Sequence, residues 1–196
     1  MLELDEQKKE KNLALFAKRL ESVGVDTSLL MSRYGAKIKE APMSTMVSSN
    51  VAYDGALLER ILRVFTPRAL QVAELLDENI RPSKEQIIKV CLLHKIALAL
   101  ILVPNTNEWE IKSRGYKYVY AKTKAGLKIG MRSVLICNEC GIQLTEEEME
   151  AMLILDRAEE GDAQAKFFST PLSIVIKLTN ELFTLENRLS NVKNED

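Results

Sequence analysis

The only histidine of the chain, His94, lies in the segment QIIKVCLLHKIALALILVP and is followed directly by Lys95. Cys91 precedes His94 by three residues, and Cys137 and Cys140 have the same spacing in CNEC. Three thiolates and one imidazole could together bind a structural zinc ion. Both pairs, however, fall inside expected helices, on apolar faces where a reduced cysteine packs as a small hydrophobic side chain. Core packing is therefore favoured over zinc binding at these four residues.

Other catalytic arrangements have little support in the sequence. One histidine in an apolar run does not suggest a Ser-His-Asp triad, and eight scattered glycines form no phosphate-binding loop. Asp156 and the glutamates of TEEEMEAM are expected on a capped, solvated helix start rather than as paired catalytic carboxylates. The segment YKYVY and its neighbouring basic residues could stack on and bind single-stranded nucleic acid. Packing of these tyrosines onto helices is favoured instead, so nucleic acid is not expected as a partner.

The composition indicates one folded domain rich in helix. The chain has 196 residues, of which 46% are hydrophobic and 28% charged, and it contains only eight glycines and five prolines. Its longest apolar run, Ile96 to Val103, is far shorter than the roughly 20 residues that span a bilayer. The N-terminal segment MLELDEQKKEKN lacks the order of a secretion signal, so a cytoplasmic location with reduced cysteines is expected.

Charge is nearly balanced overall but unevenly distributed along the chain. The formal net charge is -1. Residues 108–132 carry seven lysines or arginines against two glutamates, whereas residues 139–162 carry nine acidic residues against one arginine. A basic region of this size can attract an anionic ligand. Ordinary solvated surface charge is the commoner explanation.

Apolar residues at helical spacing predict helices over most of the chain. Ser83 with Gln86 and Thr145 with Glu148 fit capping boxes at two helix starts. The segment EWEIKSRGYKYVYA instead alternates, and it predicts a β-hairpin that turns at Gly115 and places its tyrosines on one strand face. The loop KEAPMSTMVSSNVAYDG carries no charge through most of its length and is expected to lie against the body. The predicted helices cover residues 5–23, 26–34, 56–79 with an interruption at Pro67, 83–103 and 127–140, and two more begin at Thr145 and Thr170.

The order of these segments resembles the HD-domain superfamily of metal-dependent phosphohydrolases, particularly its small bacterial members with a hairpin after the HD helix. The resemblance implies an all-α, HD-like helical bundle with one small inserted β-hairpin. It divides the chain into a helical N-terminal extension at 1–40, the HD-like domain at 41–188 and a polar tail at 189–196. The matching segments, over about 41–185, are APMST, YDGALLERILRV, EQIIKVCLLHKIALA, NEWEIKSRGYKYVYA, LKIGMRSVLICNECGIQLTEEEMEAM and TPLSIVIKLTNELF.

Enzymes of this superfamily hold divalent metal with a first histidine, an adjacent His-Asp pair and a distant aspartate, and the metal activates water for phosphate ester hydrolysis. At the matching positions this chain has Arg60, the pair His94 and Lys95, and Asn180, while Ile129 stands at an auxiliary histidine. Of the metal ligands that the resemblance expects, only the histidine at position 94 is present. A lysine or arginine ~4 Å from a cation is repelled by about 4 kcal/mol at an effective dielectric near 20. These four residues are therefore expected to be vestigial metal-site positions, with neither divalent metal nor catalytic residues.

A site that has exchanged metal for Arg60 and Lys95 could bind a nucleotide or phosphate, because guanidinium and ammonium groups pair well with anions. The leading expectation is a catalytically degenerate HD-domain protein that binds an anionic ligand or a protein partner without hydrolysis. Two alternatives stay open: a metal-dependent phosphohydrolase in which His94 joins carboxylates such as Asp54 or Glu59, and a structural interaction module, for example a homo-oligomer. A closed core is also compatible with the sequence, with Arg60 and Lys95 reaching solvent or pairing with Glu59 and Glu181.

Overall fold

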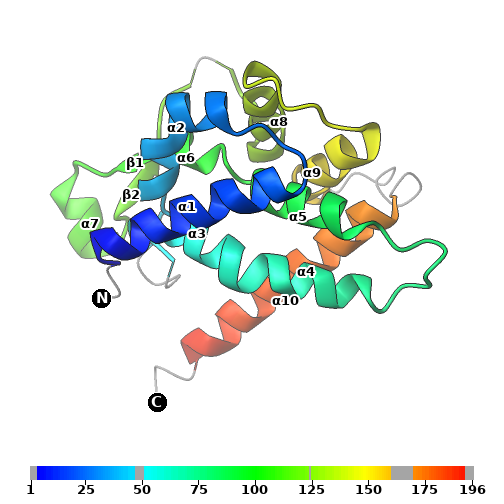
Figure 1. The fold of residues 1–196 in the computed structure, drawn as a ribbon. Helices are drawn as coiled ribbons and strands as arrows, with labels where there is room; N and C mark the ends of the chain where they lie inside the picture. The colour runs from blue at the N-terminus through cyan, green and yellow to red at the C-terminus, as the bar shows by residue number, and fades with distance from the viewer. Residues whose placement is uncertain (1–3, 47–50, 124, 160–169, 193–196) are drawn as a thin grey trace.

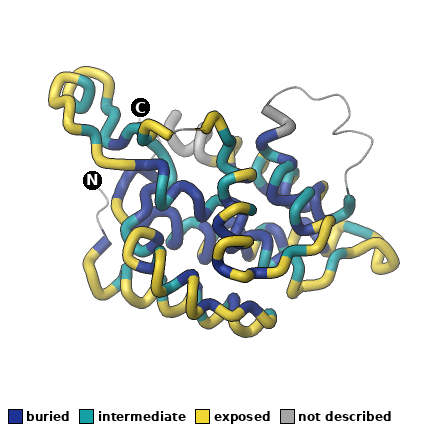
Figure 2. Tube along the Cα trace, turned by 90° about the horizontal axis from the view of Figure 1, so that it is seen from above, coloured by how far each residue is buried: buried dark blue, intermediate teal, exposed yellow. Residues whose placement is uncertain are grey.

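A computed structural model describes residues 4–46, 51–123, 125–159 and 170–192. The chain is mostly helical and carries one small two-stranded antiparallel sheet, so the expected fold class is confirmed at this level (Figure 1). A single large cluster of buried hydrophobic residues runs through the helices from the N-terminal to the C-terminal part of the chain (Figure 2). In the described ranges, no helix combines the length and hydrophobicity needed to cross a membrane.

Two N-terminal helices pack against the rest of the molecule. α1 (Glu6–Ser22) begins at Asp5, whose carboxylate accepts a hydrogen bond from the backbone N–H of Lys8, and ends before Gly24 at φ +80°. α2 (Ser28–Glu40) runs six residues beyond the expected end at Tyr34, because Ile38 continues its buried face into the common core. The residues of the expected N-terminal extension therefore share one hydrophobic core with the helices that follow residue 40.

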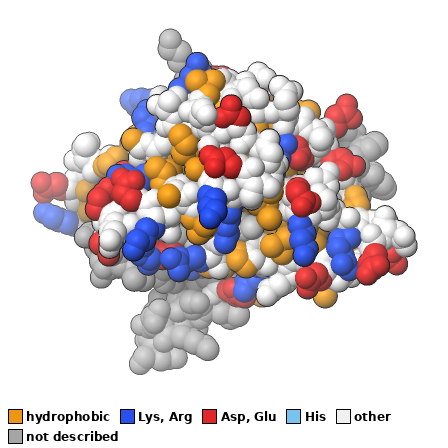
Figure 3. Space-filling view, in the orientation of Figure 1, with side chains coloured by type: hydrophobic (Ala, Val, Ile, Leu, Met, Phe, Trp, Pro, Cys, Tyr) orange, Lys and Arg blue, Asp and Glu red, His pale blue; other side chains and the backbone are white. Residues whose placement is uncertain are grey.

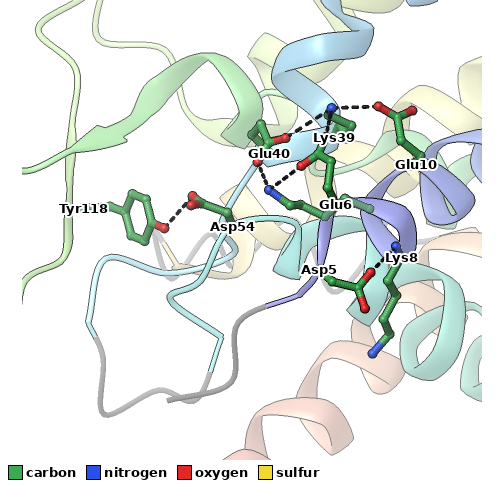
Figure 4. A network of polar contacts seen from close by, with 9 residues as sticks. Asp5, Glu6, Lys8, Glu10, Lys39, Glu40, Asp54 and Tyr118 are labelled. Carbon is green, nitrogen blue, oxygen red and sulfur yellow. Dashed lines mark hydrogen bonds and ion pairs between the residues drawn. The ribbon is translucent and has the colours of Figure 1, made fainter.

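An ion-pair network joins α1 to the end of α2 (Figure 4). The ammonium group of Lys39 pairs with Glu6 and lies 2.8 Å from a carboxylate oxygen of Glu10. Lys9 pairs with Glu40 at 2.5 Å and with Glu6 at 3.1 Å. Single exposed pairs add little to stability, but shared partners fix the relative position of the two helices. The network supplements the apolar contact between α1 and α2.

The next helical segment remains continuous through Pro67. α3 (Ala56–Arg60) leads into a π-helical turn, η2 (Ile61–Phe65), and then into α4 (Thr66–Ala73). The backbone N–H of Thr66 reaches the carbonyl of Ile61, five residues back. This wider turn accommodates the proline, which lacks an N–H and whose ring would otherwise crowd the preceding turn. The helix ends at Ala73 rather than at the expected Asn79.

α5 (Lys84–Leu93) starts with the predicted capping box, in which Ser83 and Gln86 exchange hydrogen bonds between side chain and backbone. Its predicted extent to Val103 is wrong, because the helix ends at Leu93. His94 Nδ1 donates a hydrogen bond of 2.8 Å to the carbonyl oxygen of Cys91. If the helix continued, this oxygen would accept the hydrogen bond from the backbone N–H of Lys95. Ala97 N–H donates instead to Ser133 Oγ, 3.2 Å away. A side chain and a tertiary contact thus terminate the helix. The chain continues through α6 (Leu98–Ile101) into β1 (Leu102–Pro104).

The hairpin exists, but its strands differ from those expected. β1 pairs antiparallel with β2 (Tyr118–Tyr120), and α7 (Glu108–Arg114) lies between them. The predicted strand around Trp109 is helical because Asn107 Oδ1 caps the N–H groups of Trp109 and Glu110, and Gly115 closes the helix at φ +68°. Of the tyrosines expected on one packed face, Tyr118 is buried and Tyr120 is exposed.

Three longer helices complete the fold: α8 (Ile129–Glu139), α9 (Glu146–Glu159) and α10 (Pro171–Val192). α9 packs against both α8 and α10. The predicted caps are confirmed, since Thr145 and Glu148 exchange hydrogen bonds and Thr170 Oγ1 accepts from a backbone N–H of the first turn of α10. The expected polar tail, residues 189–196, lies partly outside the described residues, and α10 continues to Val192.

The loop between α2 and α3 lies against the body as expected, in the part of it that the structure describes. Val51, Ala52 and Tyr53 are buried, and Tyr118 of β2 donates a hydrogen bond to Asp54 at 2.7 Å (Figure 4). Residues 47–50 of this loop lie outside the described residues. On the face shown in Figure 3, basic and acidic side chains are interspersed, with no large area of a single sign.

Candidate functional site

A cavity of ≈ 280 Å³ opens where the end of α5 meets α8, α9 and α10. His94 and Lys95 reach it from the C-terminal end of α5, and Asn180 reaches it from α10. Three of the four positions that were expected to be vestigial metal-site residues therefore line one space. The other lining residues are Ile129, Gly130, Met152, Leu155, Asp156, Lys177 and Glu181.

The His94 side chain is neutral, and its ring packs in the hydrophobic core. Its exposed fraction is 2%, and its ring stacks on Phe65 with 4.6 Å between the ring centroids. Because a carbonyl oxygen only accepts hydrogen bonds, His94 Nδ1 carries the proton that it donates to Cys91, and Nε2 has a free lone pair. Among the described residues Nε2 has no hydrogen-bond partner. Burial, with a further contribution from the charge of Lys95, lowers the pKa of His94 to about 3.

Two ammonium groups contribute positive charge to the cavity. Lys95 Nζ donates a hydrogen bond of 3.0 Å to Asn180 Oδ1 and lies 5.8 Å from the ring centroid of Phe65. Lys177 precedes Asn180 by three residues on α10, so both occupy the same side of this helix. Lys177 makes no hydrogen bond or ion pair with any other described residue. The side-chain amide of Asn180 retains its N–H donors because its oxygen accepts from Lys95.

Asp156 joins the cavity to the start of α8. Its Oδ2 accepts a hydrogen bond of 3.1 Å from the backbone N–H of Met131, in the first turn of that helix. The carboxylate is therefore stabilised by the N-terminal end of the helix dipole. The expectation of a solvated Asp156 is wrong, because its exposed fraction is only 9%. Gly130 makes this approach possible, since a Cβ there would lie 2.3 Å from the carbonyl oxygen of Met152 and 2.7 Å from Asp156 Oδ2.

Arg60 does not line this cavity. It lies at the end of α3, beside Tyr53. Burial and a hydrogen bond to Glu59 raise the pKa of Tyr53 to about 12, and the positive charge of Arg60 opposes this rise. Glu59 does not pair with Arg60, as the sequence had allowed. It binds Lys8 at 2.6 Å and accepts a hydrogen bond of 2.8 Å from Tyr53. Arg60 therefore contributes no anion-binding group to the space that Lys95 lines.

The three cysteines are buried, and none is in a disulfide. Burial raises the pKa of Cys91, and that of Cys137 to about 12, so a thiolate is disfavoured at both positions. The ring of His94, the fourth residue of the zinc arrangement considered, uses Nδ1 on the backbone of its own helix. Within the described ranges, no three His, Cys, Asp or Glu side chains are placed to hold a metal ion.

Several cavity residues were not identified from the sequence. Lys177 could have been found, because it stands three residues before Asn180 in a predicted helix and so lies on the same side of that helix. Glu181, considered from the sequence only as an ion-pair partner, also lines the cavity. Asp156 could not have been found, because only the packing of α9 on α8 brings its carboxylate to the cavity. Comparisons of the chain with family models, curated proteins and solved structures found no match.

Proposed function

We propose that this chain is a catalytically degenerate, HD-like helical protein that binds a small anionic ligand in the cavity at His94 without hydrolysing it. The observation that carries the proposal is that two lysines, Lys95 and Lys177, line that cavity together with Asn180. His94, Lys95 and Asn180 occupy positions where the resemblance expects metal ligands, and they line one space. Lys95 stands where the resemblance expects a carboxylate ligand, so a positive charge replaces a negative one at that position.

The charges of the cavity support an anion over a metal ion. Lys95 and Lys177 repel a cation and attract phosphate or carboxylate oxygens. Two acidic side chains also line the cavity, but they differ in their environment. The carboxylate of Asp156 is already used by the N-terminus of α8, whereas Glu181 is exposed and its charge is screened by water. Lys177, with no partner among the described residues, is the side chain best placed to bind an incoming anion.

The contacts of Asp54 and Glu59 do not favour the alternative of an atypical phosphohydrolase. Asp54, suggested as a partner of His94, accepts a hydrogen bond from Tyr118, and Glu59 is bound to Lys8 and Tyr53. Neither carboxylate lines the cavity of His94. Stoichiometric transition metal in the purified protein, together with phosphate ester turnover that is lost in His94→Ala, would favour this alternative over the binding protein.

We predict that Lys177→Gln weakens the binding of inorganic phosphate and of ribose 5-phosphate by about tenfold, the factor that corresponds to ~1.4 kcal/mol for one charge-assisted hydrogen bond. The measurement is isothermal titration calorimetry on the full chain at low salt. Lys84→Gln is the matched control, since Lys84 is an exposed lysine on α5 outside the cavity. Equal affinities for wild type, Lys177→Gln and Lys84→Gln, or no binding by the wild type, would contradict the proposal.

The interaction-module alternative is favoured by one surface of α10. Ile174, Leu178, Leu182 and Leu185 follow helical spacing on its outer side and have exposed fractions of 39–53%. If a second copy of the chain covers this surface, Leu178→Glu will shift the mass measured by sedimentation equilibrium toward the monomer. Leu75→Glu is the control, because Leu75 is 84% exposed outside α10. A monomeric wild type over the accessible concentration range would remove this alternative.

A further inference from the structure

A second cavity, of ≈ 330 Å³, adjoins the one at His94. It lies between the end of β2, residues 121, 123 and 125–128, and the first turns of α8. Ile129 and Asp156 line both cavities, so they mark the junction between the two. The volume of each cavity alone is near the lower end of the range of about 300–1,000 Å³ for ligand pockets. The combined volume of the two cavities lies well within this range.

The second cavity offers an aromatic ring beside fixed positive charge. Tyr120 lines it and is 62% exposed, so its ring is accessible to a ligand. Arg132 is held in place because Nε donates to the carbonyl of Leu127 at 2.9 Å and Nη2 donates to Thr123 Oγ1 at 2.7 Å and to the carbonyl of Ala125. A guanidinium group fixed in this way loses little further freedom when a ligand binds.

The character of the second cavity differs from that of the first. Among the described residues that line it, Lys128 and Arg132 are basic and only Asp156 is acidic, and the N-terminus of α8 already binds Asp156. Lys128 donates a hydrogen bond of 3.3 Å to the backbone carbonyl of Asp156, so its charge stays close to the junction. A flat ring can stack on Tyr120 or on the guanidinium plane of Arg132, whereas the first cavity is lined by ammonium groups that suit phosphate.

We propose that the two cavities form one bipartite site for a phosphate ester that carries a flat aromatic or heteroaromatic ring. The phosphate lies near Lys95 and Lys177, the linking part crosses Ile129, and the ring stacks at Tyr120. This inference rests on the proposed function, because it assigns the anion to the cavity of His94. It adds a second subsite and a specificity-determining residue, Tyr120.

The test compares three probes by isothermal titration calorimetry: inorganic phosphate, ribose 5-phosphate and adenosine 5′-monophosphate. Stacking of a ring is expected to make the adenosine compound bind about tenfold more tightly than ribose 5-phosphate. Tyr120→Ala should abolish this difference and leave the affinity for ribose 5-phosphate unchanged, while Tyr120→Phe should preserve it. Trp109→Ala is the matched control, since Trp109 is an equally exposed aromatic residue on α7 outside both cavities.

The outcomes separate the two proposals. If ribose 5-phosphate binds in a manner that depends on Lys177 but the ring adds no affinity, the bipartite site is wrong and the anion site stands. The same conclusion follows if the added affinity survives in Tyr120→Ala or is lost in Trp109→Ala. If none of the three probes binds to the wild type, the proposed function itself fails and the bipartite site fails with it.

Discussion

The free energy of unfolding is expected to fall by about 2 kcal/mol between pH 8 and pH 5 because of His94 alone. Burial lowers the pKa of this imidazole to about 3 in the folded protein, whereas an unfolded chain has a histidine pKa near 6.5. Below pH 6.5 the unfolded state therefore binds a proton that the folded state does not. The stability is fully present above the unfolded pKa and is lost as the pH falls toward the folded pKa. Urea denaturation at a series of pH values measures this slope.

The assignment to His94 is unusually direct, because the chain has no other histidine and carboxylates titrate mostly below pH 5. His94→Gln removes the titrating group, so the stability of the variant should be nearly constant between pH 8 and pH 5. The absolute stability of the variant does not enter this comparison, since the slope is the readout. A second measurement uses the folded wild type: the NMR signals of its one imidazole should stay at their neutral positions down to pH 5. A midpoint near 6.5 would show that His94 is solvated.

Gly130→Ala is expected to destabilise the protein by about 1–3 kcal/mol, the usual cost of overpacking a close contact. An added Cβ would lie 2.3 Å from the carbonyl oxygen of Met152, which belongs to the backbone of α9 and cannot rotate away. α8 and α9 would have to separate, and the hydrogen bond from Met131 N–H to Asp156 would lengthen. Thermal and urea denaturation measure the loss. The same variant should also weaken phosphate binding, because the displaced helices form one wall of the cavity.

Gly35→Ala is the matched control for this prediction. Gly35 is also a buried glycine in a helix, α2, but a Cβ there would meet its nearest neighbours, atoms of Met31, at 3.8 Å, an ordinary contact distance. Alanine has the higher helix propensity, so Gly35→Ala should leave stability unchanged or raise it by up to ~1 kcal/mol. If Gly130→Ala proves as stable as Gly35→Ala, α8 and α9 do not approach each other as closely at Gly130 as the structure shows.

Helix starts were the most predictable part of the fold, because a cap is local. The hydrogen bonds of Ser83 with Gln86 and of Thr145 with Glu148 need only residues three positions apart, and the sequence contains both partners. Helical content was predictable for the same reason, since apolar spacing along one segment sets which face is buried. A small two-stranded antiparallel sheet after the segment of His94 was also expected, and its existence is confirmed.

Element ends were less predictable where distant residues compete for the backbone. α5 stops at Leu93, although its apolar run continues, because Ser133 of α8 takes the N–H of Ala97. The segment around Trp109 alternates like a strand, yet the side chain of Asn107 caps a short helix there. In that segment the local cap outweighs the alternating pattern, which has no partner strand to satisfy it.

Composition and local spacing were enough to predict a mostly helical chain with one histidine, too few imidazoles for the metal centre that its resemblance implies. Which side chains share a cavity follows from the tertiary packing, because His94 and Lys95 directly after α5, Asp156 of α9, and Lys177 and Asn180 of α10 are far apart in the sequence. This packing also separated Arg60 from that group and added Lys177 to it. Residue types and spacings fix what a local segment can do, while the meeting of α5, α8, α9 and α10 depends on side-chain packing over the whole core.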